Sequence, residues 1–306
     1  MLIRVGYGMT IEVAQPTHLF TMMSVHPERA RDVNWQSPTE TVPPVAKRAF
    51  IDQFGNSCLR MVAPAGEFTI TQDAIVSDTG EPDLVQPDAR EWPPEQLPDG
   101  CLRYLKGSRY CETDRLSQLA WRLFGNVTPG WARVQAVCDY VHDRLTFSYG
   151  YARSTRTALE AHQERLGVCR DFAHLAITFC RCLNIPARYV NGYLGDIGVE
   201  PDPSPMDFSA WFEVYLGGRW YTFDARHNHP RTGRIVVARG RDAMDVPLLH
   251  TFGLHTLKAF RVWTDEVDSR SRARSEPPRT AVRSRLGPPG RSPLDLGARE
   301  GVNHLI

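Results

Sequence analysis

The fold of this chain is decided by a short stretch in its middle, Gly-Val-Cys-Arg-Asp-Phe-Ala-His-Leu at residues 167–175. A small residue leads into Cys169, and apolar residues then recur at helical spacing, namely Phe172, Leu175, Ala176, Phe179 and Leu183. The pattern predicts a helix that Cys169 opens and that ends at Asn184 and Pro186, because a proline nitrogen cannot donate to the preceding turn. The unpaired N–H groups and the dipole of a helix N-terminus stabilise a thiolate. We therefore expect the pKa of Cys169 to be lowered and its nucleophilicity to be raised.

The composition is that of a globular protein without a strong charge. The 306 residues are 42% apolar, enough for one large or two moderate cores, and the net charge of +1 gives no bias toward nucleic acid or anionic membranes. No run of about 18 apolar residues occurs, and residues 1–13 are interrupted by polar side chains, so neither a membrane span nor a signal peptide is predicted. Three of the seven cysteines, Cys138, Cys180 and Cys182, fall in apolar helical patterns, where a reduced thiol acts as a small hydrophobe. We expect a cytoplasmic protein.

The residue pattern divides the chain into four segments. Residues 1–77 contain several alternating runs separated by turn residues, which predicts an N-terminal β-rich domain. Residues 78–108 are acidic and proline-rich and are expected to form an extended linker over the surface. Residues 109–265 are interpreted as the core with its trailing strands. Residues 266–306 are rich in Arg, Ser, Pro and Gly, bury too little apolar surface to offset their ordering entropy, and are expected to be disordered.

Within residues 109–265 the period of the apolar residues changes from helical to strand-like. Helices are predicted from residue 113 or 114, from Pro129 and from Thr157, before the helix of Cys169. Strands are predicted at residues 187–190, 208–216, 219–224, 234–238 and 257–262. Helices first and strands second indicate an α+β fold, with helices packed on an antiparallel sheet.

Residues 208–224 form two aromatic, alternating runs around Gly217-Gly218. They predict a hairpin with a two-residue primed turn, in which both central residues have positive φ and Leu216 pairs with Arg219. Extended along the hairpin, this register puts Ser209 and Asp224 on one face, about 7–8 Å apart at their α-carbons. The separation suits an imidazole at position 209 oriented by Asp224, and it is too long for a serine to bridge.

Four motifs in order resemble those of a known family. They are Leu-Gly-Val-Cys-Arg-Asp-Phe-Ala-His at 166–174, Asn-Ile-Pro-Ala-Arg-Tyr-Val-Asn-Gly-Tyr at 184–193, Ala-Trp-Phe-Glu-Val-Tyr at 210–215 and Phe-Asp-Ala-Arg-His-Asn at 223–228. Over roughly residues 110–230 the chain resembles the bacterial transglutaminase-like superfamily. The β-rich start is similar to the region that often accompanies this core. The resemblance implies a papain-like thiol fold whose Cys, His and Asp cleave or transfer the acyl groups of amides. By position, Cys169 would be the nucleophile and Asp224 the orienting acid, and the general-base histidine belongs at 209.

Position 209 holds a serine, and three hypotheses stay open. A serine hydroxyl cannot replace an imidazole as a base, because its pKa lies far above neutral. The first hypothesis brings in His227, His229 or His174, although the hairpin register turns His227 away from Ser209, and His174 lies about 140° round the helix from Cys169. The second has Cys169 act with the helix dipole and water alone. The third is a catalytically impaired core that binds a peptide or partner protein without turnover.

The candidate site residues are therefore Cys169, Ser209 and Asp224, and the implied partner is a peptide or protein substrate. Hydrolysis is favoured over cross-linking, because water is always present and transfer needs a site that excludes it. No cofactor is expected. A metal site that combines Cys180 and Cys182 with histidines is disfavoured, because alternate residues on a helix point away from each other. The sequence leaves the oligomeric state open.

Overall fold

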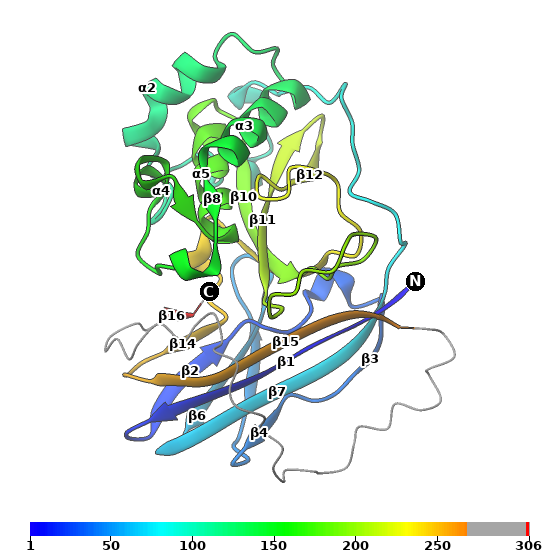
Figure 1. The fold of residues 1–306 in the computed structure, drawn as a ribbon, viewed down its shortest axis with the longest axis vertical. Coiled ribbons are helices and arrows are strands. Elements are labelled where there is room, and N and C mark those ends of the chain that lie inside the picture. Colours follow the sequence, from blue (N-terminus) through cyan, green and yellow to red (C-terminus); the bar gives the residue numbers. More distant parts are fainter. Residues whose placement is uncertain (268–303, 306) are drawn as a thin grey trace.

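The computed structural model describes residues 1–267 and 304–305 (Figure 1). A strand-rich part lies below a part that holds the long helices and a further sheet (Figure 1). The sequence predicts a disordered tail over residues 266–306. Of these, residues 268–303 and 306 lie outside the described residues.

Two antiparallel sheets build the strand-rich part, and their strands share one apolar core. The first sheet has the order β15-β1-β7-β3, with β4 also paired to β7, and the second has the order β16-β14-β2-β6-β5. The bounds are β1 Leu2–Val13, β2 Thr17–Thr21, β3 Val33–Gln36, β4 Glu40–Val42, β5 Arg48–Ile51, β6 Ser57–Ala63, β7 Gly66–Ser77, β14 Leu249–Thr251, β15 Thr256–Val267 and β16 His304–Leu305. A 3₁₀ turn, η1, covers Pro27–Arg29. The predicted alternation is clearest in β1, where every second side chain from Ile3 to Ile11 is buried.

The last long strand belongs to this part and not to the core that it was expected to trail. β15 pairs antiparallel with β1 along its length, from Leu2 opposite Val267 to Glu12 opposite Thr256. The indole of Trp263 covers Gly6 so closely that a Cβ there would lie 2.3 Å from the ring, and Trp263 donates to Asp73 over 3.0 Å. Local pattern marks a strand but not its partner, and β1 needs a neighbour on both edges. The sheets formed by residues 1–77 are thus completed by strands that follow the core in the sequence.

Helices pack on a four-stranded antiparallel sheet in the other part, so the predicted α+β fold is confirmed. The sheet has the order β12-β11-β10-β13, and α5 contacts β10 and β11 on one side and α2, α3 and α4 on the other. The bounds are α2 Thr113–Phe124, α3 Trp131–Arg144, α4 Ala158–Glu164, α5 Cys169–Cys182, β10 Ala187–Tyr193, β11 Ser209–Leu216, β12 Arg219–Phe223 and β13 Ile235–Gly240. Short elements are β8 Thr146–Phe147, η3 Tyr149–Tyr151, β9 Leu166–Gly167 and η4 Ala243–Asp245. Among residues 1–267 no helix has the length and apolar character to cross a membrane.

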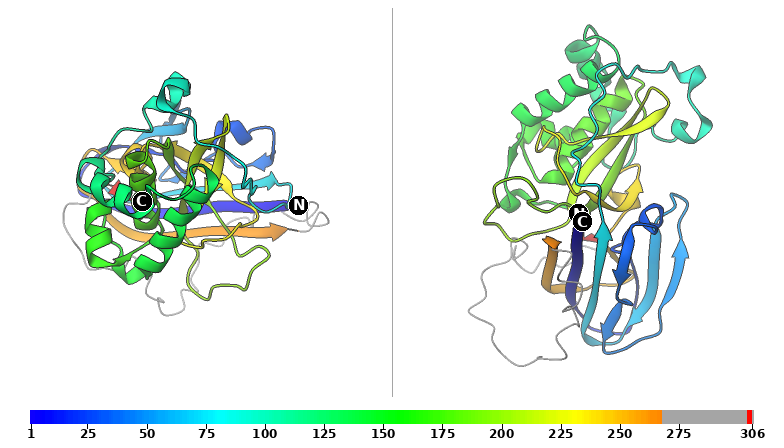
Figure 2. Two further views of the ribbon diagram at one scale, coloured as in Figure 1. Left: turned by 90° about the horizontal axis from the view of Figure 1, so that it is seen from above. Right: turned by 90° about the vertical axis from the view of Figure 1, so that its right-hand side faces the viewer.

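The proline-rich stretch is more ordered than an extended linker. It runs along one side of the helical part (Figure 2) and contains the 3₁₀ turn η2, Pro94–Gln96, and the short helix α1, Asp99–Leu102. Leu97 and Cys101 are buried against Tyr215 of β11. The carbonyl of Ala89 accepts from the backbone N–H of Trp131 over 3.0 Å. Buried apolar side chains and these backbone bonds fix the stretch to the core, where composition alone predicted a solvated connection.

The aromatic hairpin has the predicted register. Leu216 pairs with Arg219, and Gly217 and Gly218 both have positive φ, 54° and 89°. The pairing ends at Phe212 opposite Phe223, so β12 stops before Asp224. The register therefore cannot be extended to the residues that follow.

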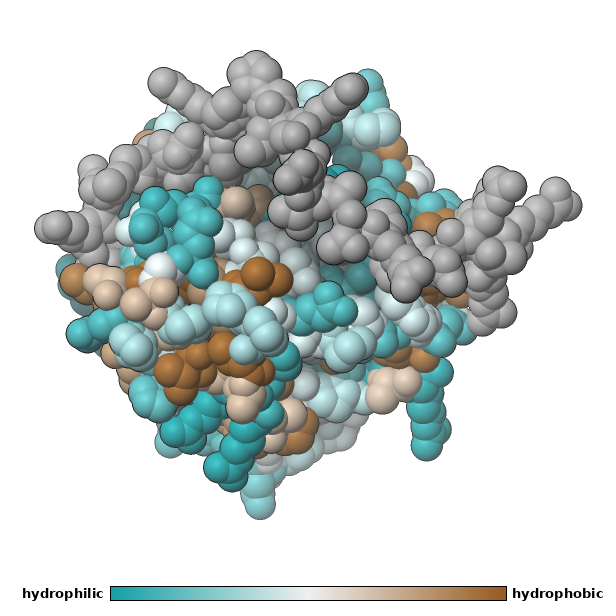
Figure 3. All heavy atoms as spheres, turned by 90° about the horizontal axis from the view of Figure 1, so that it is seen from below, coloured by the Kyte–Doolittle hydropathy of each residue, from teal (hydrophilic) through white to brown (hydrophobic). Residues whose placement is uncertain are grey.

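The surface of the strand-rich part, seen from below, mixes hydrophilic side chains with small apolar patches (Figure 3).

Candidate active site

Cys169 is the first residue of α5, as the sequence predicts. Val168 precedes the helix, and its backbone N–H donates to Oδ2 of Asp171 over 2.9 Å, which closes the first turn. Gly167 passes so near Asp171 that a Cβ on it would lie 2.6 Å from the Cβ of Asp171. The Gly-Val-Cys-Arg-Asp order thus has a packing reason: only glycine fits beside the aspartate that fixes the start of the helix.

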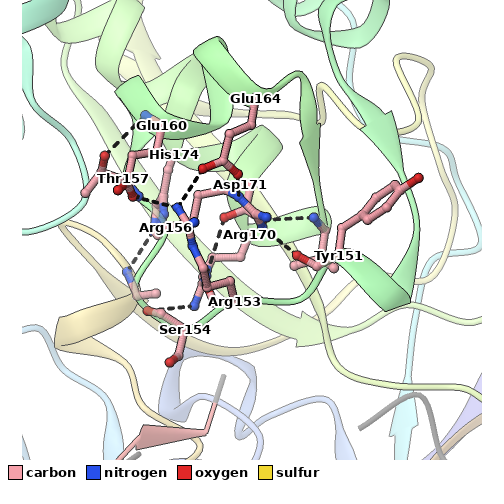
Figure 4. A network of polar contacts seen from close by, with 12 residues as sticks. Tyr151, Arg153, Ser154, Arg156, Thr157, Glu160, Glu164, Arg170, Asp171 and His174 are labelled. Atoms are coloured by element: carbon pink, nitrogen blue, oxygen red, sulfur yellow. Dashed lines mark hydrogen bonds and ion pairs between the residues drawn. The ribbon is translucent and has the colours of Figure 1, made fainter. Parts of the chain in front are cut away.

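Buried arginines hold the start of α5 against residues 151–157 (Figure 4). Arg156 donates to Oδ2 of Asp171 over 3.1 Å and to the carbonyl of Tyr151 over 2.6 Å. Arg170 donates to the carbonyls of Arg153 and Ser154. The side chains of Arg156 and Asp171 are almost wholly buried, so the loss of either partner would leave an uncompensated charge. The backbone at Cys169 is therefore held by side chains on both sides of it.

The thiol of Cys169 lies against β11. The backbone N–H of Ala210 hydrogen-bonds to it, and the charges of Arg226, Asp207 and Asp224 act on it. Burial raises the pKa of the Cys169 thiol, Asp207 and Asp224 add to the rise, and Arg226 and the Ala210 N–H oppose it. The expectation of a lowered pKa is therefore wrong: desolvation, which the sequence does not reveal, decides the direction. The thiol needs a base to become a thiolate at neutral pH.

Ser209 begins β11 and is paired with Gly192 of β10. It is only 6% exposed, and its hydroxyl has no hydrogen-bond partner within the described part of the chain. Because the backbone N–H of the next residue, Ala210, bonds to the thiol, the start of β11 lies near Cys169. The hydroxyl itself takes part in no polar contact there.

Asp224 is buried at the end of β12 and accepts four hydrogen bonds. Its Oδ1 accepts from the backbone N–H groups of Arg226 and His227, over 2.9 and 3.2 Å. Its Oδ2 accepts from Nδ1 of His227 over 2.8 Å and from Arg234 over 2.9 Å. Burial alone would raise the pKa of Asp224, but Arg234 and the bonds from His227 hold it well below its usual range. Asp224 is therefore a fixed carboxylate.

The hairpin register does not reach His227, so the orientation inferred from it does not hold for this residue. Since β12 ends at Phe223, the chain turns at Asp224, and the backbone N–H of Asn228 donates to the Asp224 carbonyl over 2.8 Å. This turn brings the His227 ring back to the Asp224 carboxylate. His227 and Ser209 are both among the residues that line a cavity of about 400 Å³. Burial lowers the pKa of His227, and Asp224 opposes that shift.

The other two histidines have different surroundings. His174 is fully buried, stacks on Tyr110 with ring centres 5.0 Å apart, and accepts from the backbone N–H of Ala243 over 3.1 Å. It is a core residue, in line with its predicted place round the helix. His229 also lines the cavity and bonds the carbonyl of Pro230 over 3.0 Å.

Arg226 and Tyr149 belong to the cavity and also interact electrostatically with Cys169. Both line the cavity, and the charge of Cys169 acts on Tyr149, whose pKa burial raises to about 12. The guanidinium of Arg226 lies over the ring of Phe147, 3.7 Å from its centre. Cys169 itself lies beside the cavity and is not among the residues that line it.

Sequence reasoning named His227 as one of three candidate bases but missed its bond to Asp224 and the positions of Arg226 and Arg234. An aspartate whose side chain accepts from the backbone two and three residues on is typical of a turn, and Asp-Ala-Arg-His-Asn after a strand was the signal for it. Arg234 comes from the segment before β13 and also bonds Asp83 over 2.8 Å, a pairing without local signal. In residues 1–267 no three His, Cys, Asp or Glu side chains converge as metal ligands would.

Comparisons with known proteins identify the family and the fold. The family model of the transglutaminase-like superfamily matches residues 117–225, a range that includes Cys169, Ser209 and Asp224. An uncharacterised protein of Mycobacterium leprae is 28% identical over 215 residues, 68% of this chain and 76% of that protein. An uncharacterised protein of Mycobacterium tuberculosis is 30% identical over 225 residues, 65% of this chain and 69% of that protein. The crystal structure of a proposed cysteine protease from Cytophaga hutchinsonii superimposes with a TM-score of 0.77 at 30% identity, over 88% of this chain and 91% of that one.

Proposed function

The chain belongs to the transglutaminase-like superfamily, and from this premise we propose that it is a thiol hydrolase or acyltransferase that acts on peptide or side-chain amides through a thioester at Cys169. The observation that carries the proposal is the setting of Cys169. It is the first residue of a buried helix, its thiol contacts the Ala210 N–H, and the fixed carboxylate of Asp224 acts on it.

The reaction at Cys169 would have two steps, formation of a thioester and its cleavage. The thiolate attacks the amide carbonyl, the amine leaves, and water or a second amine then attacks the thioester. The first N–H groups of a helix have no partner within the helix, so those at the start of α5 would supply one donor for the oxyanion. Hydrolysis is the proposed outcome, because the cavity beside the thiol is open to water and transfer would require its exclusion.

The proposed partner is a peptide or protein that offers an amide, and the proposed compartment is the cytoplasm. All seven cysteines are unpaired, and reduced thiols are typical of a reducing compartment.

A second candidate function is a binding module without turnover. Two observations favour it: Ser209 stands where the family's base is expected, and the pKa of Cys169 is raised. In that case the cavity beside Cys169 would hold a peptide or partner protein, and the thiol would stay protonated.

Release of amines from a peptide mixture distinguishes the two candidates. Incubation at pH 7.5 should release amine from the mixture, and Cys169→Ala should abolish the release. The matched control is Cys182→Ala, which removes a thiol at the other end of the same helix and should leave the release unchanged. Equal release by Cys169→Ala and the unchanged chain would contradict a thioester at Cys169. Peptide binding without release by either would favour the binding module.

A further inference from the structure

We infer that His227, oriented by Asp224, is the general base for Cys169 and performs the role that residue 209 cannot. The inference rests on the proposed function and names the group that moves the proton. Such a group is needed because burial raises the pKa of the Cys169 thiol. The hydroxyl of Ser209 cannot take up its proton at neutral pH, and it has no hydrogen-bond partner in the described residues.

The His227 ring is held as a catalytic imidazole has to be. Because the Asp224 carboxylate only accepts, the hydrogen of their 2.8 Å bond lies on Nδ1 of His227, and Nε2 keeps its lone pair. The same carboxylate is fixed by Arg234 and by two backbone N–H groups, so the ring has a rigid anchor. The side chain is 19% exposed, which leaves its outer edge in contact with the cavity.

The cavity has His227 on its wall and lies beside the thiol, although Cys169 is not among the residues that line it. His227 and Ser209 are both on its wall, and the residue after Ser209 contacts the sulfur of Cys169. The charge of Arg226 acts on both His227 and Cys169, and so does the charge of Asp224. The proton would pass from the thiol to His227 directly or through one bridging water.

The proton balance is complete without another reactant besides water. Nε2 of His227 takes the proton of the Cys169 thiol while the S–C bond forms and the carbonyl electron pair moves to oxygen. His227 then gives that proton to the amide nitrogen as the C–N bond breaks and the amine leaves. In the second half His227 takes a proton from water, which attacks the thioester. The S–C bond breaks, and the thiolate recovers the proton from His227.

Several charged groups act on this ring and enter its pH dependence. Asp224, Arg226 and Arg231 act on His227 directly. The remaining ionisable groups on the cavity wall are Tyr149 of η3, Asp196, Glu200, Asp202 and Asp207 of the loop before β11, and His229.

The test compares His227→Gln with His18→Gln, a control on an exposed histidine of β2. We expect His227→Gln to lower kcat about 100-fold or more with little change in KM, and to remove the acidic limb of the pH profile. His18→Gln should change neither quantity. The double variant Ser209→His with His227→Gln should regain activity, because an imidazole then stands where the family has one.

Two results separate this inference from the function on which it rests. If His227→Gln keeps the activity and pH profile of the unchanged protein while Cys169→Ala is inactive, the assignment of His227 is wrong and the thiol function stands. If the unchanged protein shows no turnover that depends on Cys169, both are overturned.

A measurement on the unchanged protein covers the case in which His227→Gln does not fold. Methylthiolation of Cys169 should shift the His227 ring resonances and the pH at which they titrate, and it should leave those of His18 unchanged. Unchanged His227 resonances would overturn the assignment.

Discussion

Nδ1 of His227 lies 2.8 Å from Oδ2 of Asp224, so the carboxylate at the end of β12 already holds an imidazole from its own turn. The aspartate that the resemblance pairs with residue 209 thus bonds the ring of His227. On the proposal that His227 is the base, this relationship would give a chain with serine at position 209 an acid, a base and a thiol in one region.

Arg234 is expected to be the main support of Asp224. Its guanidinium bonds Asp224 and Asp83, and all of these side chains are largely buried. Arg234→Met should lower the free energy of unfolding by about 3–5 kcal/mol, because it leaves carboxylates without their charge partner. Arg241→Met breaks a pair with Asp245 in which the arginine side chain is 43% exposed, and it should cost clearly less than Arg234→Met. Urea unfolding of both variants checks the difference, and similar losses would contradict the role given to Arg234.

Ser209→Ala should leave the free energy of unfolding within about 0.5 kcal/mol of its original value, because the hydroxyl that it removes has no partner. Ser108→Ala is the matched comparison, since the Ser108 hydroxyl accepts from Arg181 over 3.1 Å. Its loss should cost about 1–2 kcal/mol. A large loss of stability from Ser209→Ala would mean that its hydroxyl has a partner after all.

Two charges beside the thiol should change the alkylation rate of Cys169 in opposite directions. Asp207 raises the pKa of Cys169 and Arg226 lowers it, so at pH 7.5 Asp207→Asn should speed alkylation by iodoacetamide and Arg226→Gln should slow it, each about threefold or more. Burial raises the pKa of Asp207 to about 6. Below that pH its carboxyl is neutral, and the effect of Asp207→Asn should disappear.

The rate of Cys169 alkylation is measured from pH 5 to 9, with Cys169→Ala used to subtract the other thiols. If both variants speed the alkylation of Cys169, or both slow it, the rate depends on the access of the reagent to the thiol. That result would contradict an effect of the two charges on the pKa of Cys169.

Gly167→Ala should destabilise the protein by about 1–3 kcal/mol, because its Cβ would meet Asp171 at 2.6 Å. Gly150→Ala is a fair control: its Cβ would have only an ordinary contact, 3.6 Å from the Ser148 hydroxyl. Thermal unfolding compares the two, and Cys169 alkylation shows whether the start of α5 has moved. Equal stability of both variants would contradict the tight fit beside Asp171.

Local pattern was sufficient where short-range geometry decides the structure. The helix from Cys169, the Leu216–Arg219 register and the α+β arrangement follow from periodicity and turn residues. It was insufficient where distant segments meet. The pairing of β15 with β1 joins the two ends of the described fold, and no residue of either strand identifies its partner.

The site was predicted in the same uneven way. The pattern predicts a strand at Ser209, and the structure has β11 there, but the surroundings of His227 depend on where β12 stops, which is one residue before Asp224. The pKa of Cys169 depended on burial by β11, which overrides the helix terminus. Both errors arise because tertiary contacts, and not the local sequence, set strand ends and desolvation.

The most direct measurement is mass spectrometry of the protein after acid quenching in the presence of an acyl-peptide 4-nitrophenyl ester. Such an ester acylates an active nucleophile without needing a proton for its leaving group. A thioester at Cys169 predicts one acyl adduct on the peptide that contains Cys169, absent from Cys169→Ala. An adduct on Ser209, or the same adducts in Cys169→Ala as in the unchanged protein, would contradict the account.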